Sequence, residues 1–187
     1  MKKIWIAIAG LTSLISGANA SDWLFAGYVK GENNKTERVL YYDNEYISYL
    51  PNSVLRVWVK SLKNSRVKAE LMDSSKVTQA RQYIEVANQK TDAGYIPKYL
   101  QINSTNALAK SDVLSITLVE LIGQNTALDD KSTMQVQIDC LNMRQKLNLL
   151  TTYDEVGNQS QGSGDEPYRK IDPSAPLSSL AKMVCAK

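Results

Sequence analysis

The stretch TMQVQIDCLNMRQKLNLLTTY, residues 133–153, decides the fold, because apolar and polar side chains alternate along most of it. A period of two residues is typical of a strand with one buried face. In the first half, the apolar residues that share one face are Met134, Val136, Ile138 and Cys140, and the polar residues between them are Gln135, Gln137 and Asp139. Residues 145–153 can return as the next strand, with Leu147, Leu149, Thr151 and Tyr153 in phase. The sequence therefore predicts two neighbouring strands, with Cys140 pointing into the core.

Further strands are predicted on both sides of this stretch. Residues 23–30 and 38–43 read as a hairpin joined by a polar turn, and residues 168–171 read as a short last strand. Residues 159–165 (QSQGSGD) are expected to form a flexible loop. Residues 54–62 predict a strand with one apolar and one mixed face, formed by Leu55, Val57 and Val59 against Arg56, Trp58 and Lys60.

The C-terminal segment changes to a period of 3.6 residues. Ser174 is a candidate N-cap, and Pro176 is tolerated in the first helical turn. One apolar stripe at helical spacing follows, made of Leu177, Leu180, Ala181, Val184 and Cys185. The pattern predicts a terminal helix that packs on the apolar side of the sheet.

Residues 63–132 have a different character. Ser74 and Ser75 can cap a helix that runs to about Gln89. Residues 112–122 (DVLSITLVELI) are apolar nearly all round, which fits either a buried helix or a strand, and we favour the helix. The expected fold is α+β: an antiparallel sheet with the terminal helix on one face and a mostly helical insertion, about residues 63–132, on or beside the sheet.

The N-terminal 20 residues resemble a secretory signal peptide. A basic start precedes an apolar run at residues 4–15 that is too short to span a bilayer, and Ala18-Asn19-Ala20 is a small-residue cleavage site. We expect residues 21–187 to form one exported domain, periplasmic or at the cell surface. Ser21 follows the cleavage site in place of a lipidated cysteine, and no second long apolar run occurs. Neither a lipid anchor nor a membrane span is therefore expected.

The only two cysteines, Cys140 and Cys185, are expected to pair in an oxidising compartment. A disulfide between them would pin the terminal helix to the sheet and stabilise the fold by roughly 4 kcal/mol through the chain entropy of the closed loop. The alternative, a redox-active pair, usually has Cys-x-x-Cys spacing or a basic, exposed thiolate.

The composition argues against several classes of function. The chain has no histidine, and without residues 1–20 it carries 20 basic against 19 acidic side chains, so neither a metal site nor a nucleic-acid surface is expected. No nucleotide-binding or hydrolase motif occurs, and the adjacent acid pairs lie in polar turns where they are usually solvated. We expect a non-enzymatic protein that needs no cofactor.

Two groups of aromatic residues are candidates for binding a protein partner. Trp58 lies opposite the apolar face of its strand, where it is either exposed for a partner or covered by the middle segment in a second core, which we favour. If it is covered, both sheet faces are lost as recognition surfaces. Tyr95, Lys98 and Tyr99 then have the aromatic and cationic composition of a contact hot spot. Their alternative role is inward packing of the two tyrosines.

Three segments resemble the surface-adhesin protein E family of Gram-negative bacteria. They are YYDNEYISYLPNSVLRVWVKSL (residues 41–62), QIDCLNMRQKLNLLTTYDEVGN (residues 137–158) and PYRKIDPSAPLSSLAKMVC (residues 167–185). The family's order of motifs matches, with an Ile-x-Cys strand, a Tyr-Asp-x-x-Gly turn and a terminal helix that ends in Val-Cys.

This resemblance implies an antiparallel sheet with a disulfide-bonded C-terminal helix. It also implies a surface adhesin that binds host matrix or serum proteins and can form a homodimer. The alternative is a periplasmic accessory or structural protein that binds another envelope component.

Overall fold

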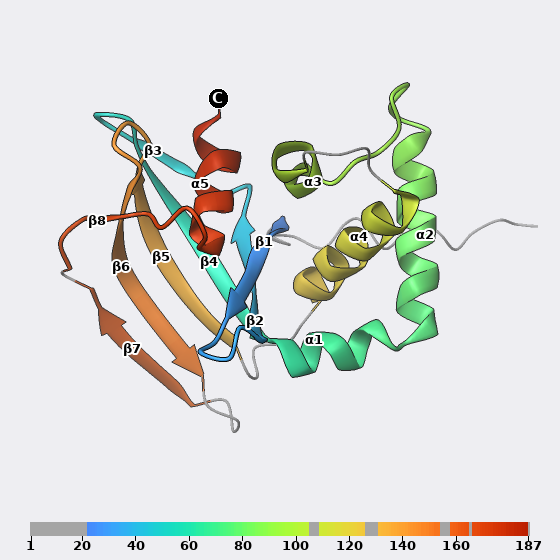
Figure 1. Cartoon of the computed structure of the whole chain (residues 1–187), viewed down its shortest axis with the longest axis horizontal. Helices are drawn as coiled ribbons and strands as arrows, with labels where there is room; N and C mark the ends of the chain where they lie inside the picture. Colours follow the sequence, from blue (N-terminus) through green and yellow to red (C-terminus); the bar gives the residue numbers. More distant parts are fainter. Residues whose placement is uncertain (1–21, 105–108, 126–130, 154–157, 165, 187) are drawn as a thin grey trace, which may run out of the picture.

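The computed structural model describes residues 22–104, 109–125, 131–153, 158–164 and 166–186, and in these ranges it confirms an α+β fold (Figure 1). The strands are β1 (Trp23–Lys30), β2 (Thr36–Asp43), β3 (Ser48–Leu50), β4 (Val54–Lys63), β5 (Lys131–Asp139), β6 (Arg144–Tyr153), β7 (Gln159–Ser163) and β8 (Arg169–Lys170). The helices are α1 (Asn64–Leu71), α2 (Ser74–Asn88), α3 (Lys98–Asn103), α4 (Lys110–Asn125) and α5 (Pro176–Cys185).

All the strands pair in one antiparallel sheet. Its order is β1-β2-β4-β5-β6-β7, with β3 paired to β4 and β8 paired to β6. The neighbours β4 and β5 are separated in the chain by residues 64–130, which contain α1 to α4. We call these four helices the helical insertion. The helix favoured for residues 112–122 is confirmed as part of α4.

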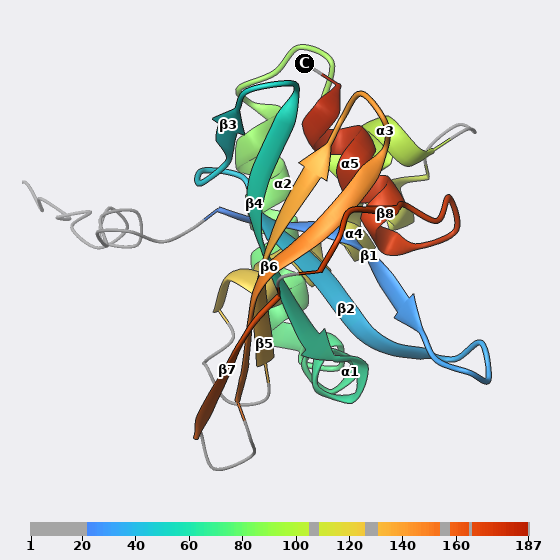
Figure 2. The same ribbon diagram turned by 90° about the vertical axis from the view of Figure 1, so that its left-hand side faces the viewer.

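The expected flexible loop at residues 159–165 is wrong for most of its length. Residues 159–163 form β7, which pairs with β6 from Tyr153↔Gln159 to Leu149↔Ser163. Main-chain hydrogen bonds hold an edge strand without a buried side-chain face, so its polar sequence carries no alternation to recognise. Figure 2 views the molecule from the side on which β7 lies and shows β7 at the outer edge of the sheet.

Two expected helix caps are also displaced by one residue. The N-cap of α5 is Ala175, and the Ser174 hydroxyl and amide instead both donate to the Asp172 carboxylate at 2.8 Å, before the helix begins. The N-cap of α2 is Asp73, whose carboxylate accepts a 2.8 Å hydrogen bond from the Ser75 amide. At α2 a carboxylate supplies the acceptor that the sequence analysis assigned to a serine, whereas at α5 no side chain caps the helix.

Different helices cover the two faces of the sheet, so the protein has two cores. The first lies between the sheet and α5 and contains Ala26, Leu40, Tyr42, Leu55, Val57, Val59, Val136, Ile138, Ile171, Leu180, Ala181, Met183 and Val184. The second lies on the opposite face, between the β1–β2 side of the sheet and the helical insertion. It contains Phe25, Val39, Tyr41, Leu62, Val67, Ala80, Ile116, Leu118, Val119 and Ile122.

The predicted disulfide is confirmed. Cys140 follows β5 and Cys185 ends α5, and the bond joins them with a Cα–Cα distance of 5.6 Å. Both cysteines are partly buried and pack against the first core. The bond therefore fixes the C-terminal end of α5 to the turn between β5 and β6.

A glycine allows α4 to approach the sheet closely. A Cβ atom at Gly123 would overlap the ring of Tyr41, which is fully buried in the second core. We expect Gly123→Ala to lower the free energy of unfolding by about 1 to 3 kcal/mol, because overpacking outweighs the better helix propensity of alanine. Urea denaturation measures this difference. Gly162→Ala in β7 is the control, because its Cβ would meet nothing within 4 Å. Equal effects of the two substitutions would contradict the prediction.

Candidate functional site

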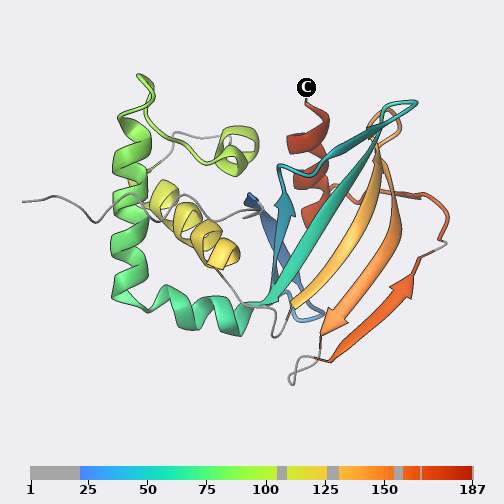
Figure 3. The same ribbon diagram turned by 180° about the vertical axis from the view of Figure 1, so that it is seen from behind.

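The helical insertion leaves part of its sheet face uncovered. Figure 3 shows β5, β6 and β7 from this side, with α1, α2 and α4 standing beside these strands. The strand register places the polar residues here on one face, because directly paired residues project to the same side of a sheet. Arg56 pairs with Gln137 and Trp58 pairs with Gln135, while Gln137 pairs in turn with Lys146. We call this surface the open face; it comprises Arg56, Trp58, Gln135, Gln137, Lys146, Leu149 and Tyr168, all of them partly exposed.

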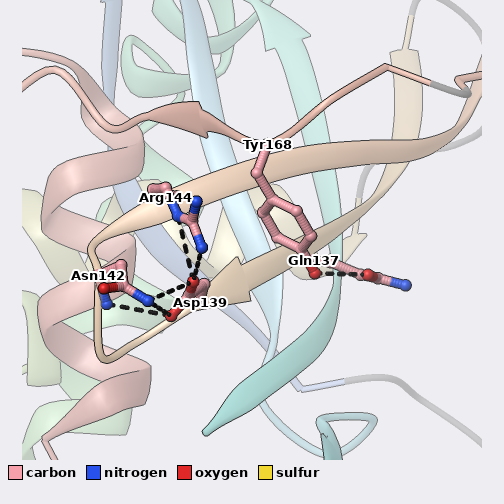
Figure 4. Close-up of polar contacts among 5 residues, drawn as sticks. All are labelled: Gln137, Asp139, Asn142, Arg144 and Tyr168. Carbon is pink, nitrogen blue, oxygen red and sulfur yellow. Dashed lines mark hydrogen bonds and ion pairs between the residues drawn. The ribbon is translucent and has the colours of Figure 1, made fainter. Parts of the chain in front are cut away.

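Hydrogen bonds orient the two glutamine side chains of the open face. The Tyr168 hydroxyl donates to Gln137 Oε1 at 2.8 Å (Figure 4), and Asn148 Nδ2 donates to Gln135 Oε1 at 3.1 Å. Each amide oxygen therefore already accepts one hydrogen bond, whereas each amide NH₂ group keeps its two donor hydrogens. Among the described residues, these NH₂ groups have no acceptor.

The turn between β5 and β6 holds Tyr168 in place. Arg144 donates to Asp139 Oδ2 through Nη2 at 2.7 Å and through Nε at 3.2 Å, and Asn142 donates to both oxygens of the same carboxylate (Figure 4). These hydrogen bonds, first from Asn142 and then from Arg144, lower the pKa of Asp139 to about 2. The Arg144 guanidinium also lies 5.6 Å from the centroid of the Tyr168 ring. The acidic group beside the open face is thus already engaged within the protein.

Arg56 is the cation at the β4 side of this surface. Its Nε atom is buried and has no hydrogen-bond partner in the part of the chain that the structure describes. The side chain as a whole is partly exposed, so a ligand on the open face can meet its positive charge. Together with the oriented amides, Arg56 makes the open face a surface that donates hydrogen bonds.

Trp58 belongs to this surface and not to the second core. The expected second core is confirmed on this face, but the expectation that it covers Trp58 is wrong, because the core forms over Phe25, Val39 and Tyr41 and does not include Trp58. Lys60 helps to hold the insertion beside Trp58 and not over it. Its Nζ donates to the Gly123 carbonyl of α4 and lies 4.3 Å from the centroid of the Trp23 ring. The insertion therefore docks at the β1–β2 side, and the expectation that both sheet faces are lost is also wrong.

Lys98 and Tyr99 begin α3 and Tyr95 lies just before this helix, apart from the open face. The Tyr99 ring centroid is 4.6 Å from that of Phe25, and Tyr99 contacts both cores. The Tyr95 hydroxyl lies 3.5 Å from Glu120, and Lys98 Nζ is 5.8 Å from the centroid of the Tyr42 ring. These contacts agree with the inward-packing alternative for the two tyrosines. Partner binding by the three residues stays a prediction.

A buried carboxyl group lies where the insertion meets β1. Glu120 of α4 is 4% exposed, and its Oε1 accepts a 3.3 Å hydrogen bond from the Phe25 amide. Burial raises the pKa of Glu120 to about 7, and the hydrogen bond from Phe25 limits the rise. The same cause raises the pKa of Tyr95 above its usual range. Glu120 thus connects α4 to the edge strand β1, and this contact requires a carboxyl group to be buried.

The insertion also contains a groove of about 730 Å³ between α2 and α4. Its lining includes the apolar side chains of Ile84 and Leu114 together with Arg81, Glu85 and Lys110. Because both charge signs line it, charge does not select a class of ligand for this groove.

No family model, curated protein or solved structure matches this chain. The resemblance to the adhesin protein E family therefore stays a prediction. In the described part of the chain, no helix is long and apolar enough to cross a membrane, and no three Cys, Asp or Glu side chains gather as a metal site. The open face is the candidate site with the most fully defined geometry.

The sequence analysis found Trp58 but missed Arg56, Gln135, Gln137 and Tyr168 as members of one surface. The alternating pattern did place Gln135 and Gln137 together on the polar side of their strand. The missing information was the pairing of β4 with β5, which brings Arg56 and Trp58 beside the two glutamines.

Proposed function

We propose that this chain is a non-enzymatic binding protein, exported to the envelope of a Gram-negative bacterium, whose open face takes a protein partner. One observation carries the proposal: Trp58 and Tyr168 are partly exposed on a sheet region that no helix covers in the described structure, and hydrogen-bond donors surround them. Aromatic and arginine side chains are enriched among the residues that dominate binding energy at protein interfaces.

Further support comes from the compartment. The N-terminal sequence resembles an export signal, and the Cys140–Cys185 disulfide suits an oxidising compartment. The resemblance to the adhesin protein E family favours a host matrix or serum protein as the partner. A periplasmic partner is the alternative, and cell fractionation distinguishes the two locations.

We expect Trp58→Ala to weaken binding of the partner about 30-fold, the effect of losing a residue worth about 2 kcal/mol at an interface. The exported protein is passed over immobilised host matrix and serum proteins and over purified envelope proteins, and affinities are measured by surface plasmon resonance. Tyr83→Ala is the matched control, because Tyr83 is 46% exposed but lies on α2. If Trp58→Ala retains the native circular dichroism spectrum and binds as tightly as Tyr83→Ala, the open face is not the binding surface.

A further inference from the structure

The hydrogen-bond donors of the open face indicate the chemistry of its partner. We propose that it recognises an extended acidic segment of a protein, in which alternate Asp or Glu side chains point at the sheet. This inference rests on the proposed function and names the class of partner. Its basis is the set of oriented donors on β4 and β5.

The amide groups supply the first argument. Tyr168 and Asn148 each donate to one of the two amide oxygens, which turns Gln137 and Gln135 so that both hydrogens of each NH₂ group stay available to a ligand. A glutamine that could turn freely would serve donors and acceptors equally. Here the internal hydrogen bonds select a ligand that offers acceptor oxygens.

The charges narrow the acceptor to an anion. The register places Arg56 directly beside Gln137. The negative charge of Asp139 is balanced by Arg144, and its oxygens also accept three hydrogen bonds from Asn142. Arg56 is partly exposed on the open face, and hydrogen bonds between a guanidinium and a carboxylate are among the stronger ones in proteins.

The spacing favours a polypeptide. Gln135 and Gln137 are two residues apart on β5, so their side chains are about 7 Å apart along the strand. Alternate side chains of an extended peptide have the same spacing, so two successive inward-pointing carboxylates can meet the two amides in register. Trp58, which pairs with Gln135, offers an apolar surface to the aliphatic part of one of these side chains.

Fluorescence anisotropy of the exported protein with two labelled peptides tests this inference. The acidic peptide is (Glu-Thr)₅, and the basic peptide is (Lys-Thr)₅. We expect the acidic peptide to bind and the basic peptide not to bind. Arg56→Glu should weaken binding of the acidic peptide at least tenfold. Arg81→Glu is the matched control with the same charge change on α2, and it should weaken binding less than twofold.

Several outcomes would overturn the inference. These are failure of the acidic peptide to bind at low salt, equal effects of Arg56→Glu and Arg81→Glu, and equal binding of polygalacturonate, which would show an unselective response to polyanions. If Arg56→Glu fails to fold, Arg56→Gln replaces it. This variant should weaken binding of the acidic peptide at least threefold. The side-chain amide resonances of Gln135 and Gln137 should also shift when the acidic peptide is added, and unchanged resonances contradict the proposal.

These results are independent of the test of the proposed function. If Trp58→Ala abolishes capture of a protein partner but the acidic peptide does not bind, only the acidic segment is refuted. If the acidic peptide binds through Arg56 but Trp58→Ala leaves capture unchanged, the proposed function is refuted while the preference for acidic ligands stands.

Discussion

Removing the Cys140–Cys185 disulfide is expected to lower the free energy of unfolding by about 4 kcal/mol, the chain entropy of a loop with a sequence separation of 45 residues. Because typical domains have a stability of about 5 to 15 kcal/mol, a loss of this size would bring the protein close to unfolding at 37 °C. The double substitution Cys140→Ser and Cys185→Ser, followed by urea denaturation, measures the effect. The sheet should stay formed while α5 loosens.

Reduction of the unaltered protein provides the control for this experiment. Dithiothreitol should shift the unfolding midpoint of the unaltered protein as far as the double substitution does, and it should leave the substituted protein unchanged. Hydrogen exchange should rise first in α5, because the bond lies at the end of that helix. A midpoint that neither treatment moves would contradict the structural role of the bond.

The second large effect concerns the buried carboxyl of Glu120. Its pKa is raised from 4.5 to about 7 in the folded protein. Between these two pH values the unfolded chain loses this proton while the folded protein keeps it, so stability falls as the pH rises from 4.5 to 7. Above pH 7 the free energy of unfolding has fallen by the full amount, about 3 kcal/mol. Glu120→Gln should therefore match the unaltered protein at pH 4.5 and exceed its stability at pH 8.

Glutamine suits this test because it keeps the geometry. Its Oε1 atom can still accept from the Phe25 amide, and its NH₂ group can donate to the Tyr95 hydroxyl. Other titratable groups that act on Glu120 are Asp22 and Tyr95, and both remain in the variant. Urea midpoints from pH 4.5 to 8 give the measurement, with the exposed Glu85→Gln as the control. A pH dependence that Glu120→Gln leaves unchanged would contradict the prediction.

Local periodicity predicted most of the elements of this fold. The alternation in β4 and β5 and the apolar stripe of α5 follow directly from burial of one face, so each could be recognised within a few residues. The cysteines then connected α5 to β5. By contrast, β7 has no apolar face, and only the exposed hydrogen-bonding edge of β6 makes its sequence a strand.

The candidate site was less predictable, because it depends on contacts between distant segments. Trp58 was recognised as unusual from its own strand, but its surroundings depend on where the insertion docks. That position is determined by Lys60 and by Gly123, which lie far apart in the sequence. The inward packing of Tyr95 and Tyr99 likewise depends on Glu120 and Phe25.

The position of the insertion has a consequence for how the chain folds. The nine residue pairs between β4 and β5 join strands separated by residues 64–130. Closing a loop of that length costs about 2.5 kcal/mol more chain entropy than closing a hairpin of about four residues. Strands β1 to β4 can pair as soon as they emerge during synthesis, whereas β5 must wait for the whole insertion. The seam between β4 and β5, which creates the open face, is therefore a late event in folding, and the binding surface exists only after the two halves of the sheet have met.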